Sequence, residues 1–99
     1  MNEIEEATLI LRDVIDPELG LDIVALGLVY AVDVSPDEVR VAMSTTSPMC
    51  PMGEVLLSSA EQVLRRRYPA RAVTVELVSE PPWQVRMMDD AARRALGLR

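Results

Sequence analysis

Cys50, the only cysteine of this chain, has the clearest chemical potential; it lies in the motif Thr-Ser-Pro-Met-Cys-Pro. Proline is favoured at the first position of a helix, so Pro51 predicts a helix that begins directly after the thiol. Unpaired N–H groups and the positive dipole at a helix start stabilise a thiolate. Hydroxyls of Ser44, Thr46 and Ser47 can donate hydrogen bonds to the same sulfur. We therefore expect a reactive cysteine; the alternative is a small buried hydrophobic residue.

Carboxylates form the second candidate cluster. Asp16 and Glu18 flank Pro17, and Asp22 follows four residues after Glu18. Carboxylates in a loop bind metal ions or transfer protons. The chain has no histidine, the residue that most often shares these roles. The alternative is a turn in which the Asp16 carboxylate accepts hydrogen bonds from backbone N–H groups.

Composition narrows the possible partners. Hydrophobic residues make up 49% of the 99 residues, enough for one core and a single domain over 1–99. Sixteen Asp and Glu against ten Arg give a net charge of -6, which repels a phosphate backbone. No apolar run approaches the ~20 residues that cross a bilayer. One cysteine and an acidic N-terminus indicate a reducing, cytoplasmic location, and we expect neither nucleic acid nor membrane as a partner.

The elements that must position these groups follow from apolar periodicity. Helical spacing predicts three helices, over residues 2–14, 51–68 and 89–96. Alternation predicts three strands, over residues 28–34, 39–45 and 73–78, with a structured loop at 16–27. The order α-β-β-α-β-α suits a two-layer α+β domain, a three-stranded sheet with its helices on one face. Trp83 follows the last strand, where its indole covers the core edge or caps a pocket.

Five motifs occur in the order of one known family. They are Asp-Pro-Glu at 16–18, Leu-Gly-Leu-Val-Tyr at 26–30, the cysteine segment at 43–51, Pro-Pro-Trp at 81–83 and Ala-Arg-Arg-Ala-Leu-Gly at 92–97. Together they cover nearly the whole chain and resemble the metal-sulfur cluster biosynthesis family, once called domain of unknown function 59. Its members include SufT-like and PaaD-like proteins. The chain lacks a PaaD-like cysteine-rich tail, which favours the short SufT-like form.

The resemblance implies an α+β iron-sulfur cluster assembly domain that matures cluster proteins and is not an enzyme. It places the functional positions of the family on Asp16, Glu18, Thr46 and Cys50. Residues 44–46 read Ser-Thr-Thr where the family usually reads Thr-Leu-Thr, so Thr46 alone is carried over from that stretch.

A single thiol limits how a cluster is held, because common clusters take four thiolate ligands. We expect Cys50 to be a transient iron-sulfur cluster ligand or a docking thiol, with Asp16 and Glu18 orienting it or completing the coordination. A symmetric homodimer would supply two Cys50 sulfurs. Other ligands would come from carboxylates, a small thiol, or the partners, which are expected to be iron-sulfur scaffold proteins or client apoproteins.

Two other functions remain open at this point. A thiol enzyme would use Cys50 as nucleophile and Asp16 or Glu18 as base, but cysteine catalysis usually relies on histidine. A KH-like nucleic-acid module shares the helix-strand-strand-helix-strand order, but it needs a Gly-x-x-Gly loop and positive charge that this chain lacks.

Overall fold

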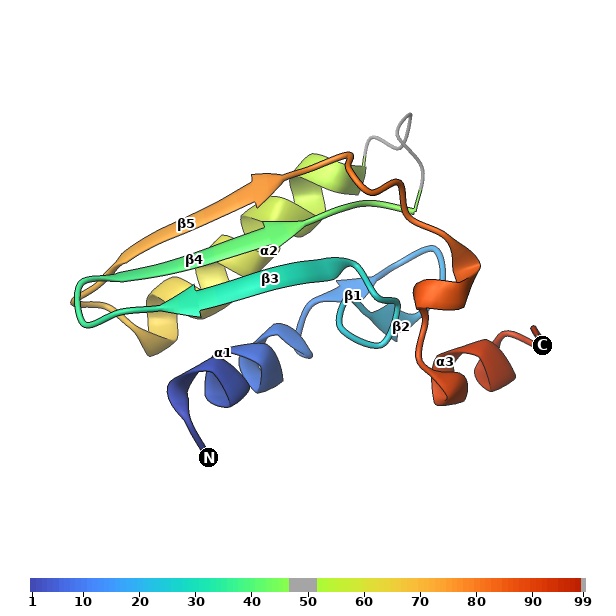
Figure 1. Ribbon diagram of the computed structural model, residues 1–99, viewed down its shortest axis with the longest axis horizontal. Coiled ribbons are helices and arrows are strands. Elements are labelled where there is room, and N and C mark those ends of the chain that lie inside the picture. Colours follow the sequence, from blue (N-terminus) through green and yellow to red (C-terminus); the bar gives the residue numbers. More distant parts are fainter. Residues whose placement is uncertain (47–51, 99) are drawn as a thin grey trace.

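A computed structural model describes residues 1–46 and 52–98. The elements in chain order are α1 (Glu3–Leu11), β1 (Ile15–Asp16), β2 (Leu21–Asp22), β3 (Val29–Val34), β4 (Glu38–Met43), α2 (Met52–Arg67), β5 (Ala72–Leu77), the 3-10 helix η1 (Val85–Met87) and α3 (Asp90–Ala95). In Figure 1, α2 lies behind the sheet formed by β3, β4 and β5, and the C-terminal segment lies beyond the end of that sheet. The predicted α+β fold with a three-stranded sheet is confirmed.

The sheet combines both kinds of strand pairing. Its order is β3-β4-β5; β3 and β4 are antiparallel, whereas β4 and β5 are parallel. The helix α2 makes the crossover between the two parallel strands, as a β-α-β unit requires. Met43 and Leu77 are partners at the last position of this ladder. The residues that follow β4 and β5 therefore emerge side by side.

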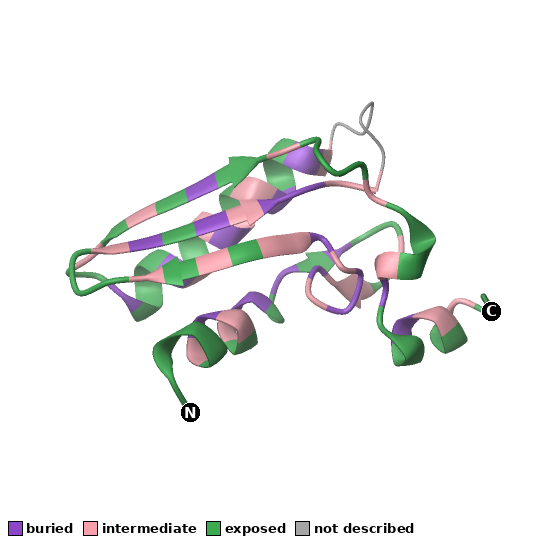
Figure 2. Cartoon of the chain, viewed as in Figure 1, coloured by how far each residue is buried: buried purple, intermediate pink, exposed green. Residues whose placement is uncertain are grey.

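The main core lies between α2 and the sheet. The helix buries a stripe with a spacing of three or four residues: Gly53, Leu56, Ala60 and Leu64. The central strand β4 buries alternate residues, namely Val39, Val41 and Met43 (Figure 2). These two periods are the ones that predicted a helix and a strand from the sequence.

The segment between α1 and β3 differs most from the prediction. The helix was expected to reach residue 14 but ends at Leu11, because the next three amides bond to carbonyls three residues earlier and tighten the last turn. The expected loop at 16–27 contains a short antiparallel pair, β1 with β2. Its turn closes where the N–H of Gly20 donates to the Asp16 carbonyl oxygen at 2.7 Å. Two-residue strands are too short to give a periodic signal.

The C-terminal segment packs against the loop that precedes β3. The indole Nε1 of Trp83 donates to the Leu26 carbonyl oxygen at 2.7 Å, and the Asp89 N–H donates to the Ala25 carbonyl oxygen at 2.9 Å. Met88 is buried in the same region. The 3-10 helix η1, which the periodicity did not predict, brings the chain to this contact. Across residues 1–46 and 52–98, no helix combines the length and the apolar character needed to cross a bilayer.

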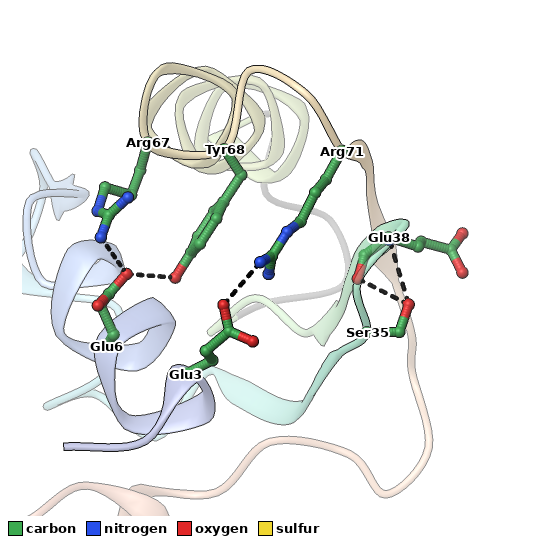
Figure 3. Close-up of polar contacts among 7 residues, drawn as sticks. All are labelled: Glu3, Glu6, Ser35, Glu38, Arg67, Tyr68 and Arg71. Atoms are coloured by element: carbon green, nitrogen blue, oxygen red, sulfur yellow. Dashed lines mark hydrogen bonds and ion pairs between the residues drawn. The ribbon is translucent and has the colours of Figure 1, made fainter.

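A polar cluster joins α1 to the end of α2 (Figure 3). The Tyr68 hydroxyl donates to Glu6 Oε1 at 2.9 Å, and the same oxygen pairs with Arg67 at 2.6 Å. Arg71 pairs with Glu3 at 2.8 Å. The guanidinium carbons of Arg67 and Arg71 lie 5.2 and 5.1 Å from the centre of the Tyr68 ring, within cation-π range. Both the hydroxyl and the ring of Tyr68 are therefore held by contacts with charged side chains.

Tyr68→Phe is expected to lower the free energy of unfolding by about 1 kcal/mol at neutral pH, because one buried hydrogen bond is lost while the ring remains. Burial and the hydrogen bond to Glu6 raise the pKa of Tyr68 above its ordinary value of 10.0. The stabilisation is therefore fully present below pH 10 and is lost as the pH rises through the higher pKa of the folded state. Urea unfolding of both proteins should converge above pH 10; a constant difference would contradict this contact.

Candidate functional site

A cavity of about 280 Å³ opens at the C-terminal ends of β4 and β5. It is lined by Ser44, Thr45, Thr46, Leu77, Val78, Ser79, Pro82 and Trp83. The carboxyl ends of parallel strands are the usual place for ligand sites in α/β units. The volume is at the low end for small-molecule pockets, so it suits one or two side chains of a partner.

The cavity wall includes Thr46, four residues before the cysteine in the sequence. Thr46 lies in the cavity wall and is the last described residue before the segment 47–51. On the other side of that segment, α2 begins at Met52, as expected for a helix that starts close after the thiol. Cys50 itself, with the predicted first helical residue Pro51, lies outside the described residues. The structure thus places Thr46 and Met52, the residues on either side of that segment.

Gly53 brings the start of α2 against the ends of the two parallel strands. A Cβ at this position would lie 2.8 Å from Thr45 Cγ2 and 3.5 Å from Leu77 Cδ1. Glycine inside a helix costs about 1 kcal/mol relative to alanine, so close packing is the physical reason for it here. The first turn of α2 and the cavity wall are therefore held as one unit.

Asp16 adopts the turn role that was its alternative interpretation. Its side chain is buried, and Oδ1 accepts hydrogen bonds from the N–H groups of Glu18 at 2.8 Å and Leu19 at 3.4 Å. The side chain of Glu18 is exposed. Neither carboxylate lines the cavity, but β1, which ends with Asp16, packs against α2. The loop after α1 therefore folds onto the helix that follows the cysteine segment.

Asp22 also closes a turn. Its Oδ2 accepts a hydrogen bond from the Ala25 N–H at 2.9 Å and lies 3.4 Å from an Arg12 nitrogen. Within the part of the chain that the structure describes, no three His, Cys, Asp or Glu side chains are grouped closely enough to hold a metal ion. The described carboxylates alone therefore do not make a metal centre.

Trp83 fills both of the roles considered for it. It is half-buried and packs against the hydrophobic core, and it also forms part of the cavity wall. Sequence reasoning missed the wall residues that follow β5, Val78 and Ser79. A helix-long connection between two strands is typical of parallel pairing, and that signal would have placed these residues beside Thr46.

Three exposed carboxylates lie near the cavity wall in sequence. Glu80 follows the wall residue Ser79, and Glu54 follows Gly53. Glu76 precedes the wall residue Leu77, but the side chains of the two residues lie on opposite faces of the strand. All three carboxylates are exposed, and none forms an ion pair with a described residue. An apolar cavity with Glu80 between two of its wall residues favours a partner segment that carries an apolar side chain next to lysine or arginine.

Comparison with known proteins gives consistent matches along the chain. The family described as iron-sulfur cluster assembly protein matches residues 4–77. The Fe-S protein maturation auxiliary factor SufT of Staphylococcus aureus (strain USA300) is 45% identical over 86 residues, which is 86% of this chain and 98% of that protein. The Fe-S protein maturation auxiliary factor YitW of Bacillus subtilis (strain 168) is 38% identical over 89 residues, covering 89% of this chain and 87% of its own.

A solved structure agrees with these relatives. The crystal structure of a domain of unknown function 59 from Bacillus anthracis has a TM-score of 0.89 and 39% sequence identity, over 97% of this chain and 92% of that one. Sequence and fold thus match over most of the length, as the five motifs predicted. The chain belongs to the iron-sulfur cluster assembly protein family.

Proposed function

We propose that this protein is an iron-sulfur cluster maturation factor in which Cys50 is a transient ligand of a cluster in transit, or a docking thiol for its carrier. One observation carries the proposal: Thr46, four residues before Cys50 in the sequence, lies in the cavity wall, in a chain of an iron-sulfur assembly family. The cluster is cargo, because one thiol cannot supply the four ligands of a resident cluster.

The neighbouring polar residues have separate parts in this proposal. Thr46, in the cavity wall, donates a hydrogen bond to the thiolate or to what it binds. Asp16 holds the turn through its bonds to the Glu18 and Leu19 amides. The exposed Glu18 carboxylate orients the thiol or completes the coordination. Remaining ligands come from the donor or client.

The partner follows from the apolar cavity and the exposed Glu80 between two of its wall residues. We propose that a segment of a scaffold or client apoprotein places an apolar side chain between Leu77 and Trp83, while a basic residue of that segment pairs with Glu80. Such pairing is screened by salt, so the encounter is faster at low ionic strength. The reducing cytosol is the proposed location, where a lone thiol stays reduced.

The direct test is anaerobic reconstitution of the wild type and Cys50→Ala with ferrous iron and sulfide, followed by incubation with an apoprotein that requires a cluster. Wild type is expected to gain visible charge-transfer absorbance and to restore the activity of the apoprotein, whereas Cys50→Ala does neither. Cys50→Ser is a matched control, because it keeps size and polarity but not the thiolate. If wild type and Cys50→Ala stay equally colourless, direct cluster binding is wrong and an adaptor role remains.

Three further variants separate the turn from the carboxylate chemistry. Asp16→Ala is expected to lower the free energy of unfolding by about 1 to 2 kcal/mol, because it leaves the Glu18 and Leu19 amides without their acceptor. Asp16→Asn keeps the Oδ1 acceptor, so it should lose less stability than Asp16→Ala. Glu18→Gln changes an exposed side chain, so it should stay within about 0.5 kcal/mol of wild type. Glu18→Gln is expected to transfer clusters more slowly, whereas Asp16→Asn, which keeps the turn, should transfer them near the wild-type rate. Unchanged transfer by Glu18→Gln would remove its carboxylate from the proposal.

A further inference from the structure

β5 leaves one side of its backbone open at the edge of the sheet. Among the described strands it pairs with β4 alone, over all six of its residues and without a bulge. It contains no proline or lysine, the residues that commonly protect an edge. The opposite edge strand, β3, has a register irregularity between Val29 and Ala31, and α1 packs against it. The β5 edge is therefore the less protected of the two (Figure 1).

The hydrogen bonds at its two ends fix which backbone groups point outward. The N–H groups of Ala72 and Val78 donate toward β4 at 2.9 and 2.8 Å. Groups of alternate residues in a strand point to opposite sides, so the residues of the other parity direct their N–H and C=O groups away from the sheet. These outward residues are Val73, Val75 and Leu77.

The side chains of β5 alternate in the same way. Val75 is buried toward α2, and Leu77, on the same side of the strand, is 40% exposed at the edge. Thr74 and Glu76 are exposed on the open face of the sheet. Thr74 pairs across the ladder with Arg40, which is also exposed. The edge thus offers apolar side chains on one face and one charge on the other.

We propose that β5 pairs antiparallel with β5 of a second copy of this chain, about a two-fold axis through Val75, to make a continuous six-stranded sheet. In this register Val75 faces its own copy, Val73 faces Leu77, and Thr74 faces Glu76. Each outward N–H and C=O of the three apolar residues gains a partner. This inference goes beyond the proposed cluster role and does not depend on it.

The strand is complementary to itself. The exposed Leu77 becomes covered by Val73 of the partner, and aliphatic pairs across antiparallel strands are favourable. Glu76 directly faces a neutral threonine, and the like charge of Glu76 on the second copy is its diagonal neighbour across the two-fold axis. The net charge of -6 on each copy opposes association at long range. The dimer is therefore weak and strengthens as salt screens this repulsion.

The register also separates the two cavities. In this register Ser79 of one copy faces Arg71 of the other copy. Because Arg71 and Ser79 are eight residues apart in each chain, the two Ser79 residues, one at each cavity, are eight residues apart along the paired strands. At a rise of ~3.3 Å per residue, the two Ser79 positions lie ~26 Å apart along the strands. The two cavities therefore lie at opposite ends of the paired strands.

Charge substitutions at Thr74 test the register. Thr74→Asp places a negative charge opposite Glu76 of the partner twice, and we expect the dissociation constant to rise about threefold to tenfold. Thr74→Arg places two opposite-charge pairs there, and the constant should fall by a similar factor. Sedimentation equilibrium from about 10 µM to 1 mM protein, at low and high salt, measures both.

The two Thr74 substitutions should change the stability of a single chain in the opposite direction to its association. This difference separates an effect on folding from an effect on the dimer. Within one chain Thr74 neighbours Arg40, so Asp at this position adds an attractive pair and Arg a repulsive one. Ala31→Asp and Ala31→Arg, on β3, are matched controls that should leave association unchanged. Hydrogen exchange at rising protein concentration should slow at Val73, Val75 and Leu77. A monomer at 1 mM and high salt, or equal dissociation constants for both Thr74 variants, overturns the proposal.

Discussion

Gly27→Ala is expected to lower the free energy of unfolding by about 3 to 4 kcal/mol. Gly27 has a φ of +74°, where a residue with a Cβ is strained by about 1 to 2 kcal/mol. The added Cβ would also lie 2.2 Å from the carbonyl oxygen and 2.6 Å from the carbonyl carbon of Met87. Both are backbone atoms, so the segment that carries buried Met88 must move.

Gly20→Ala provides the matched control for this prediction. Gly20 has nearly the same φ, +71°, but a Cβ there would meet no atom within 4 Å. Only the conformational cost remains, about 1 to 2 kcal/mol. Urea unfolding monitored by far-ultraviolet circular dichroism gives both values. Equal losses in the two variants would mean that the contact with Met87 has no energetic weight.

Trp83→Ala is expected to lower the free energy of unfolding by about 3 kcal/mol, because a large aromatic surface leaves the core edge and the buried carbonyl of Leu26 loses its donor. The same change removes one wall of the cavity beside Thr46. Delivery of a cluster to an apoprotein should therefore slow, even under conditions where the variant is fully folded.

Trp83→Phe separates the two consequences. Phenylalanine keeps an apolar wall but cannot donate to the Leu26 carbonyl, so the loss of stability should be about 1 to 2 kcal/mol. Partner binding at the cavity should then stay near the wild-type level. A Trp83→Phe protein that folds well but delivers clusters as slowly as Trp83→Ala would contradict an apolar docking role.

The long helices and strands of this fold could be predicted because burial of one face requires apolar residues at a regular spacing. The stripe of α2 and the alternation in β4 each continue over several residues. The pairing of β1 with β2 could not be predicted, because a strand of two residues is too short to show an alternation of apolar and polar side chains. The parallel arrangement of β4 and β5 is indicated by the helix-long connection between them and not by side-chain alternation, which is the same in both directions of a strand.

The candidate site was predictable to a different extent at each residue. Thr46 was expected beside the thiol and lies in the cavity wall. Asp16 carries a local turn signal that describes its observed bonds, whereas its distance from Cys50 depends on the segment 47–51, outside the described residues. Val78 and Ser79 join the wall through long-range topology alone, which no local motif encodes.

The close contact between Gly53 and Thr45 has an evolutionary consequence. With 2.8 Å between the Thr45 methyl and a Cβ at position 53, the two sites share one volume. In homologous chains we expect an alanine at position 53 to be accompanied by serine or another residue without that methyl at position 45. Such paired replacements would appear as covariation between positions 45 and 53, even where residues 46–51 do not change.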